Sequence, residues 1–312
     1  MAGESVTVFS PATVANVAVG FDILGLALHS VGDTVTAEKT AEPGVRIRSV
    51  TGLPLDLPLD PAKNTAGWVV IRLLETVKPD FGVELSVKKG IPLGSGMGGS
   101  AASAVGALVA VNHLLEKPLS KPELLSYALL GEELASGSPH GDNVTPCLFG
   151  GLTLTRNLNP VDVVQIPVPA SLMVVVVHPD YRLDTRMSRA VLRKELPLKD
   201  FVQQSANLAG FLAGCYTQDM NLIGRSFRDV LIEPRRSILI PGFDQAKSAA
   251  LAAGALGCSI SGSGPSVFAL VPDRATGESV ASGITASFSR EGITSSFWIS
   301  EVNMDGAKRV VA

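Results

Sequence analysis

The sequence predicts an α+β protein built from two units. Short segments with alternating apolar residues, typical of strands, are interrupted by longer segments with apolar residues at helical spacing. A turn-rich stretch at about 155–170, which contains NLNPVDVVQIPVPA, separates the two units. The chain of 312 residues is long enough for two domains. We therefore expect an amino-terminal domain at 1–165 and a carboxy-terminal domain at 166–312.

The first unit is expected to contain at least four strands and three helices. The strands are SVTVF, DTVTAEK, GVRIRSV and VELSVKK, which lie between Gly, Pro or Asp breaks. The helices are expected at 64–77, 100–115 and 122–135. Asn64 is expected to cap the first helix, which ends before Pro79.

The second unit follows a different order. A strand at 172–178 precedes helices near 199–230 and 242–254, and a pair of strands is expected around CSISGSGPSVFALV. A helix near 276–290 and a last strand, SSFWISEV, complete the unit. Strand, helices, two strands, helix, strand is the order of a split βαβ arrangement, so we expect a ferredoxin-like second domain.

The composition argues against several classes of protein. A formal charge of −3 and a pI near 5.9 provide no basic field for nucleic acid or anionic lipid. The amino-terminal residues show no basic segment followed by an apolar run, and the longest apolar segments are too short to span a bilayer. We expect a soluble, cytoplasmic protein with no membrane partner.

The cysteines are odd in number and far apart. This suits neither a disulfide framework nor a thiolate metal site. We expect reduced core residues at Cys147, Cys215 and Cys258.

The segment 90–104, GIPLGSGMGGSAASA, carries the main functional signal. A strand that leads through a glycine loop into a helix offers backbone N–H donors and the positive end of a helix dipole, which together stabilise a phosphate. Its glycines fit G-x-G-x-x-G, but the preceding strand is charged on alternate positions and no strand follows the helix, which argues against a dinucleotide-binding fold. The chain contains no GK[ST], which excludes a P-loop NTPase. A tight turn would explain the glycines but not the hydroxyls of Ser95, Ser100 and Ser103.

Three motifs resemble those of one family. IPLGSGMGGSAASA resembles the phosphate-binding motif P-x-x-x-G-L-G-S-S-A of the GHMP kinases (galactose, homoserine, mevalonate and phosphomevalonate kinases). SPATVANVAVGFDILGLAL at 10–28 is similar to the amino-terminal motif of that family in its homoserine kinase form, and SISGSGPSVFAL at 259–270 resembles its carboxy-terminal glycine motif. The resemblance implies the GHMP kinase fold, in which a ribosomal-protein-like α+β domain precedes a ferredoxin-like α/β sandwich.

The resemblance implies ATP as the phosphate donor. Met97 replaces the usual leucine of the motif, and Gly99 stands where the first serine of the pair is common, so backbone N–H groups would replace one hydroxyl contact. Asn64 is implied to contact adenine, which is compatible with a helix cap because a cap uses the amide oxygen and leaves the NH₂ free. The implied nucleotide-binding residues are Asn64, Pro92, Leu93, Gly94, Ser95, Gly96, Met97, Gly98, Gly99, Ser100 and Ser103.

The resemblance also implies Mg²⁺, with Ser100 and Glu132 as its ligands. The residues three, four, seven and eight positions before Glu132 are all apolar, so its carboxylate lies on an apolar helix face and needs a counter-charge. The neighbours of Glu133 are nearly as apolar, and either residue could be solvated near the helix end. The helical period alone therefore leaves the choice open.

The polar residues outside the phosphate site resemble those of the homoserine kinases. An amino-acid substrate has a carboxylate and an ammonium, so its pocket should offer guanidinium and carboxylate groups. The resemblance implies that Arg189 and Arg236 bind the carboxylate of L-homoserine and that Asp22 faces its ammonium. Thr185 is implied to lie near the accepting hydroxyl or the transferred phosphoryl group. Further substrate contacts are implied for Asn16, His140, Asn143 and Gly262.

Some of these residues also have simpler interpretations. Arg189 belongs to a closely spaced set of arginines and could be a solvated helix charge. Arg235 could be confused with Arg236, and His140 could be a surface residue of a Gly/Pro loop.

The catalytic residues implied by the resemblance are Asn143, Thr185 and Glu132. Mevalonate-type relatives have an aspartate where this chain has Asn143, and an amide cannot take a proton. We therefore expect catalysis by alignment and charge stabilisation, with the proton leaving to phosphate or water. Asp142 is the alternative base, although it also suits a turn.

The implied reaction is ATP-dependent phosphorylation of L-homoserine to O-phospho-L-homoserine, a step of threonine biosynthesis. Two alternatives stay open: a GHMP kinase for another small alcohol, such as mevalonate or a sugar, and a ligand sensor without turnover. Asp22 argues against the first, and Ser100 together with Glu132 argues against the second. Members of the family are often dimers, so a homodimer is expected.

Overall fold

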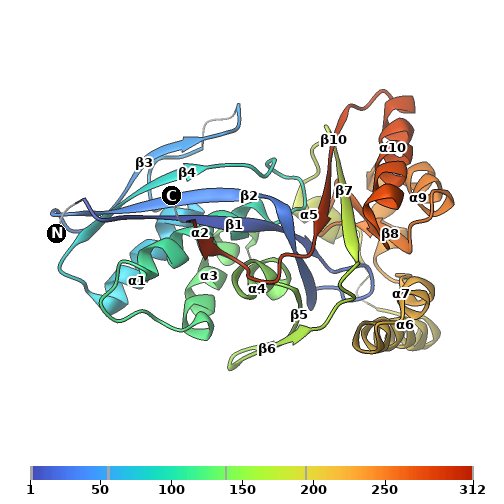
Figure 1. Ribbon diagram of the computed structural model, residues 1–312, viewed down its shortest axis with the longest axis horizontal. Helices are drawn as coiled ribbons and strands as arrows, with labels where there is room; N and C mark the ends of the chain where they lie inside the picture. The colour runs from blue at the N-terminus through green and yellow to red at the C-terminus, as the bar shows by residue number, and fades with distance from the viewer. Residues whose placement is uncertain (1–2, 55–56, 138, 194, 311–312) are drawn as a thin grey trace.

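The structure, a computed structural model, describes residues 3–54, 57–137, 139–193 and 195–310, except for the side chains of Ser136 and Thr185. Its described strands form two sheets, one of seven strands and one of four (Figure 1). The α+β class is confirmed. None of the helices in these ranges is long and apolar enough to cross a membrane.

The first sheet holds the four predicted strands and three others. Its strands are β1 (Ser5–Ala15), β2 (Leu24–Thr40), β3 (Val45–Thr51), β4 (Gly82–Lys88), β5 (Leu152–Leu158), β6 (Val161–Ile166) and β11 (Lys308–Arg309). The order is β11-β1-β2-β4-β3, and β5 pairs with β2 and β6. Within this sheet β3 and β4 are parallel, whereas the other pairs are antiparallel. An irregularity between Pro11 and Thr13 lets β1 continue to Ala15, beyond its predicted end.

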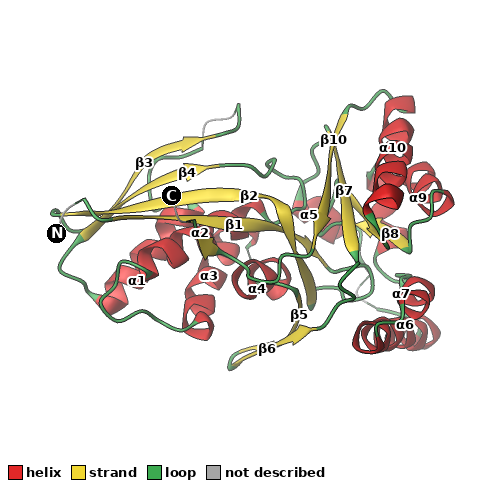
Figure 2. Ribbon diagram, in the orientation of Figure 1, coloured by secondary structure: helices red, strands yellow, loops and turns green. Residues whose placement is uncertain are grey.

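Four helices lie along one face of this sheet (Figure 2). They are α1 (Thr65–Val77), α2 (Gly99–Asn112), α3 (Lys121–Ser136) and α4 (Gly141–Phe149). Every residue of α2 from Ala101 to Val111 is buried, since small side chains let it lie against the sheet and between its neighbours. The sequence did not predict α4, because its Gly, Pro, Asp and Asn residues are typical of a loop. Burial of Val144, Cys147 and Leu148 stabilises this helix despite its composition.

The second sheet has the strand order that the sequence predicts. It consists of β7 (Met173–Pro179), β8 (Gly257–Ile260), β9 (Val267–Val271) and β10 (Ser295–Glu301), in the antiparallel order β10-β7-β9-β8. This is the order of a ferredoxin-like sheet, with α9 (Phe243–Ala252) and α10 (Arg274–Arg290) packed together. Alternate residues of β7 enter different cores: Val174 and Val176 join the core of the first sheet, and Val175 and Val177 pack with α9 and α10.

The remaining helices lie along the chain between β7 and β8, two strands of the second sheet. They are α5 (Thr185–Ala190), α6 (Leu198–Thr217), α7 (Met220–Ser226) and α8 (Glu233–Arg236), followed by the 3-10 turn η1 (Ser237–Leu239). The expected hinge at 155–170 mostly forms the β5–β6 hairpin instead, because β6 pairs in register with β5. The chain leaves the first sheet after Ile166 and enters the second at Met173. The domain boundary at 165 and 166 stays a prediction.

The chain returns to the first sheet after β10. Val302 forms a bridge with Leu28, and Asn303 N donates to the carbonyl of Ala27 at 2.9 Å. Ala307 N donates to the carbonyl of Cys147, near the end of α4, at 2.7 Å. β11 then pairs with β1 along the edge of the sheet. Residues 302–310 therefore brace the first sheet and α4.

The three cysteines are buried and free, as predicted. Burial raises the pKa of each thiol to about 12. They are therefore core side chains in their neutral form.

Candidate active site

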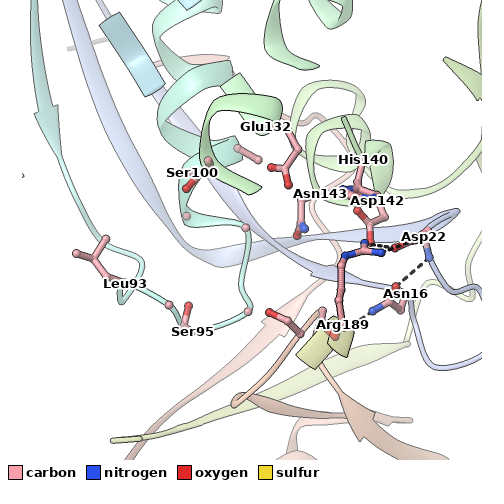
Figure 3. A pocket seen from close by; sticks show the side chains of 18 of the residues that line it. Asn16, Asp22, Leu93, Ser95, Ser100, Glu132, His140, Asp142, Asn143 and Arg189 are labelled. Atoms are coloured by element: carbon pink, nitrogen blue, oxygen red, sulfur yellow. Dashed lines mark hydrogen bonds and ion pairs between the residues drawn. The ribbon is translucent and has the colours of Figure 1, made fainter. Parts of the chain in front are cut away.

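A cavity of about 180 Å³ brings most of the predicted site residues together (Figure 3). It receives residues from the segment after β1, from the glycine loop, from α3 and α4, and from α5, α8 and the turn after β8. The lining residues are Asn16, Asp22, Pro92, Leu93, Gly94, Ser95, Gly96, Gly98, Gly99, Ser100, Ala101, Glu132, Ala135, His140, Asp142, Asn143, Arg189, Arg236, Gly262 and Ser263.

The glycine loop is held in place by close backbone contacts. Gly96 and Gly98 have φ values of 77° and 70°, which favour glycine. A Cβ at Gly98 would collide with the hydroxyl of Thr13, and one at Gly96 would collide with the carbonyl of Ser261. Ser261 Oγ also donates to the carbonyl of Gly96 at 2.7 Å. The loop and the glycine motif at 259–270 therefore pack against each other, which explains why both are rich in glycine.

The first turn of α2 points toward this cavity. Its N-cap is Gly98, and no side chain caps the helix, so the amides at its start are available to an anion. Ser100 lies in this turn, and its exposed side chain lines the cavity. Met97 is fully buried and does not line the cavity, so its side chain anchors the loop in the core.

The structure distinguishes Glu132 from Glu133. Glu132 is half-buried and points into the cavity from α3 (Figure 3). Glu133 is exposed and does not line the cavity. An oxygen ligand from Glu132 and one from Ser100 thus share one cavity with the amides of the loop. One or two protein oxygens together with phosphate are the donor set that Mg²⁺ prefers, so these residues fit that ion.

The other end of the cavity is charged. Arg189 donates to both carboxylate oxygens of Asp22, at 2.8 and 3.2 Å, and both side chains remain partly exposed. Asn16 Oδ1 accepts a hydrogen bond from the amide of Asp22 at 3.0 Å, and Asn16 Nδ2 donates to the carbonyl of Gly262 at 3.0 Å (Figure 3). Asn16, Val17 and Ala18 all have positive φ values, so a left-handed turn carries Asp22 into the cavity.

Arg236 is the buried guanidinium of the site. It is 3% exposed and donates to the carbonyls of Gly262 at 2.8 Å and Ser188 at 3.2 Å. Arg235 is only partly buried and does not line the cavity, so the structure separates the two neighbours. Burial lowers the pKa of Arg236, and the guanidinium of Arg189 lowers it further. Phe21 lies 5.2 Å from one guanidinium and 5.6 Å from the other, which favours both cations.

The start of α4 lies beside this charged end. His140 is the N-cap residue and lines the cavity. Thr13 Oγ1 donates to Asn143 Oδ1 at 2.7 Å, which fixes the amide so that its NH₂ group can donate to a ligand. Asp142 lies in the first turn of the helix, so its interpretation as a turn residue is wrong.

Asp142 is buried and lines the cavity. Burial raises the pKa of its carboxyl to about 7, and the carboxylates of Asp22 and Glu132 add to that rise. The guanidinium of Arg189 opposes it. Because the carboxyl of Asp142 is only 5% exposed, it titrates near neutral pH.

A second cavity, of about 130 Å³, adjoins the first. Leu93, Gly99 and Ser100 line both cavities, and the second also receives Asn64 and Ser103. Asn64 caps α1 as predicted, because its Oδ1 accepts from Ala66 N at 3.0 Å. Its Nδ2 donates to the carbonyl of Pro58 at 3.0 Å, so the expectation that its NH₂ is free is wrong, and one N–H remains for a ligand.

Another predicted residue, Ser103, does not line the main cavity. The Ser103 hydroxyl donates to Asp33 at 2.9 Å and accepts from Lys89 at 2.8 Å, so it is already used within the protein. Thr185 begins α5, but its side chain lies outside the described part of the chain. Sequence reasoning missed Thr13, Asp33 and Lys89. The alternation of Val83, Leu85 and Val87 along β4 continues to Lys89, and it was the one signal that this lysine is buried.

Comparison with known proteins defines the class. The model of the GHMP kinases N terminal domain matches residues 64–151, and that of the GHMP kinases C terminal domain matches residues 211–290. The chain belongs to the GHMP kinase family, and its fold is the GHMP kinase fold. It is therefore an enzyme of the kinase class.

Homoserine kinases are among its full-length relatives in that family. It is 49% identical to the homoserine kinase of Xylella fastidiosa (strain 9a5c) over 98% of this chain and 94% of the relative. It is 45% identical to that of Chlorobaculum tepidum over 98% of both. The crystal structure of homoserine kinase from Cytophaga hutchinsonii superimposes with a TM-score of 0.95 at 46% identity, covering 98% of this chain and 97% of that one.

Proposed function

We propose that this protein transfers the γ-phosphoryl group of ATP to the side-chain hydroxyl of L-homoserine, giving O-phospho-L-homoserine for threonine biosynthesis. The single observation that carries the proposal is the content of the main cavity. It combines a glycine loop at an uncapped helix start with a carboxylate, Asp22, and two guanidinium groups, Arg189 and Arg236. Only an acceptor that bears both charges matches that end. The homoserine kinases at 45–49% identity favour L-homoserine over mevalonate, a sugar or a sensor role.

ATP would span the two cavities. The amides around Gly98 and the dipole of α2 would bind its phosphates, and the adenosine would enter the second cavity toward Asn64. Leu93, Gly99 and Ser100 line both cavities, so one ligand can reach from one to the other. Ser100 and Glu132 would hold Mg²⁺, which when bound neutralises charge on the triphosphate.

L-Homoserine would bind by exchange of ion pairs. Arg189 and Asp22 pair with each other at 2.8 Å, so the substrate carboxylate has to draw Arg189 away while the substrate ammonium takes its place at Asp22. Arg236 is fixed by two carbonyls and supplies the second guanidinium. Asn16 holds the turn that carries Asp22, and it anchors that turn to Gly262.

Catalysis would depend on alignment. The NH₂ group of Asn143 would donate to the reacting oxygens, with Thr185 and His140 near them, and the proton of the hydroxyl would leave to phosphate or water. Asp142 is the alternative base, because a carboxyl with a pKa of about 7 can accept a proton at neutral pH. Replacing Asp142 by Asn decides between them: near-complete loss of kcat with an unchanged KM for L-homoserine would assign the base to Asp142.

The test of the proposed function is ADP release with four acceptors: L-homoserine, L-serine, mevalonate and galactose. We expect turnover with L-homoserine and at least tenfold lower kcat/KM with L-serine, whose hydroxyl is one methylene short of the phosphate. A higher kcat/KM with mevalonate or galactose than with L-homoserine would show that the proposed substrate is wrong. Nucleotide binding without any ADP release would make the protein a sensor.

The homodimer and the cytoplasmic location are also proposals. Leu198, Phe201, Val202 and Tyr216 on α6 are all more than half exposed, and such an apolar helix face suits a second copy. Light scattering of the wild type and of Phe201→Glu tests this proposal. We expect the wild type to be a dimer and Phe201→Glu to be a monomer, because the variant places a negative charge in the apolar interface. The free cysteines support the location.

A further inference from the structure

A buried charged cluster lies beneath the glycine loop. The ammonium of Lys89, at the end of β4, forms an ion pair with the carboxylate of Asp33 in β2. Lys89 is 4% exposed, and Asp33 is 0% exposed. The hydroxyl of Ser103 in α2 completes the cluster, since it accepts from Lys89 and donates to Asp33. These three residues are the loop-support cluster.

Stability alone does not explain this cluster. A buried ion pair is often no more stabilising than apolar side chains of the same size, because both charges lose their hydration. Neighbouring positions on β2, β4 and α2 are buried valine, leucine and alanine, whereas Lys89 and Ser103 also border the second cavity. The contacts of the cluster with the main chain indicate what it does instead.

The cluster binds the main chain at both ends of the glycine loop. Asp33 Oδ1 accepts from the amides of Gly90 at 3.0 Å and Ile91 at 3.3 Å, where the loop begins. Lys89 Nζ donates to the carbonyl of Gly99 at 2.8 Å, where the loop passes into α2. The segment between these points contains the glycines at 94, 96 and 98, which have no side chain to restrict φ and ψ, so the loop depends on contacts with its surroundings for its shape.

We propose that Asp33, Lys89 and Ser103 are positioning residues, which hold the two ends of the phosphate loop at the separation that makes its amides converge on the nucleotide. The proposal rests on the proposed ATP site, but it concerns nucleotide binding and not the identity of the acceptor. Asp33 binds the amides at the start of the loop, and Lys89 binds the carbonyl at its end. Ser103 links both charged groups to α2. The hydroxyl of Ser103 thus supports the loop rather than contacting a phosphate.

Two variants with one control test the proposal. The double variant Asp33→Asn/Lys89→Met removes both charges together, so no uncompensated charge is left in the core. Ser103→Ala keeps the ion pair and the bond from Lys89 to the carbonyl of Gly99, and it removes only the hydroxyl that bridges the two charges. The matched control is Lys88→Met, the same substitution one residue earlier on β4, where the lysine is exposed.

The measurements are KM for ATP, KM for L-homoserine, kcat, the melting temperature, and calorimetric binding of a non-hydrolysable ATP analogue. For the double variant we expect KM for ATP and the analogue Kd to rise about tenfold, with KM for L-homoserine unchanged within about twofold. Ser103→Ala should raise the same two constants about threefold, and Lys88→Met should leave them at wild-type values.

A melting temperature that falls while KM for ATP stays at the wild-type value would show that the cluster only stabilises the fold, and would overturn the proposal. If the double variant does not fold, Ser103→Ala alone tests the proposal. An unchanged KM for ATP in Ser103→Ala would then overturn it. The calorimetric measurement needs no acceptor. If L-homoserine proves not to be the substrate, the binding of the analogue still separates the two outcomes.

Discussion

The two ends of the main cavity are built differently. The phosphate end is formed by backbone: the amides of a glycine loop and of an uncapped helix start, fixed by contacts such as that between Ser261 and Gly96. The acceptor end is formed by charged side chains, Asp22, Arg189 and Arg236, which come from three distant segments. Under the proposed function, the backbone would bind the phosphates that all ATP-dependent kinases share, whereas the charged side chains would select the acceptor. Affinity for the common ligand and specificity for the variable one would then have separate structural origins.

The phosphate end should be the more sensitive to backbone change. Gly98→Ala adds a Cβ that collides with the Thr13 hydroxyl in a left-handed conformation, so we expect kcat/KM for ATP to fall on the order of 10³-fold. Gly137→Ala is the matched control, since Gly137 also has a positive φ but has open space around its Cβ position. Equal losses in steady-state assays of both variants would refute a role for close packing in the loop.

A side chain is also decisive at the phosphate end if Glu132 binds the metal. Glu132→Gln keeps the shape and removes the charge, so we expect kcat to fall on the order of 10²-fold at saturating ATP. Glu133→Gln, one residue further along α3 and exposed, should keep wild-type kcat. A larger loss at Glu133 would reverse the assignment. Titration of activity with Mg²⁺ should show a raised requirement only in Glu132→Gln.

The acceptor end should respond to the charge of the ligand. Asp22→Asn frees Arg189 from its partner and removes the counter-charge for an ammonium, so we expect Kd for L-homoserine to rise about 30-fold. The same variant should bind 4-hydroxybutyrate, which lacks the ammonium, about threefold more tightly than the wild type does, since Arg189 no longer has to leave Asp22.

Calorimetry with both ligands measures this crossover. Asp162→Asn removes another aspartate that pairs with an arginine, Arg156, away from the cavity, and it should change neither Kd. If Asp22→Asn weakens both ligands alike, the Asp22–Arg189 pair does not compete with the substrate.

One contact joins the two ends. Thr13 bonds Asn143 through its hydroxyl, and its amide donates to the carbonyl of Met97 in the loop at 3.1 Å. Thr13→Val leaves the amide oxygen of Asn143 without its donor, so we expect kcat to fall about tenfold with little change in either KM. Thr13→Ser keeps the hydroxyl and should restore kcat. A loss of equal size in the serine variant would point to packing instead of orientation.

The smallest effect concerns stability at the acceptor end. The pKa of Asp142 is raised from 3.8 to about 7, so unfolding releases its proton between these values, and stability falls as pH rises from about 4 to 7. The groups that face it are Asp22, Glu132 and Arg189. Asp142→Asn should therefore melt about 5 °C higher than the wild type at pH 8 and equally below pH 4. Calorimetric melting across this range checks it, and a constant difference would exclude titration of Asp142.

The phosphate end was predictable because its signal is local. The glycines, the serines and the helix that follows all lie in one continuous stretch, residues 90–112, and the cap by Asn64 is equally local. The choice between Glu132 and Glu133 could not be predicted, because the residues that precede them on the helix are similarly apolar. Only the packing of α3 shows which carboxylate enters the cavity. The loop-support cluster joins Asp33 to residues 56 and 70 positions away, a separation that no local pattern spans.

The same distinction holds for the fold. The second sheet followed from the order of its segments, and α2 followed from its small apolar residues. The sequence did not predict α4, because burial in the tertiary structure stabilises a helix whose composition is typical of a loop. It did not predict β6, because the turn-forming residues around this strand indicated a hinge. Since α4 carries Asp142 and Asn143, which line the cavity, this side of the site depends on a helix that the local sequence does not predict.

The return of residues 302–310 to the first sheet has a consequence for biosynthesis. These residues are synthesised after all the other strands of both sheets, yet they pair with β1 and contact the end of α4. A nascent chain that stops short of them leaves the edge of β1 open and α4 without its brace. Assembly of the first sheet and of α4 is therefore completed only after all four strands of the second sheet have been synthesised.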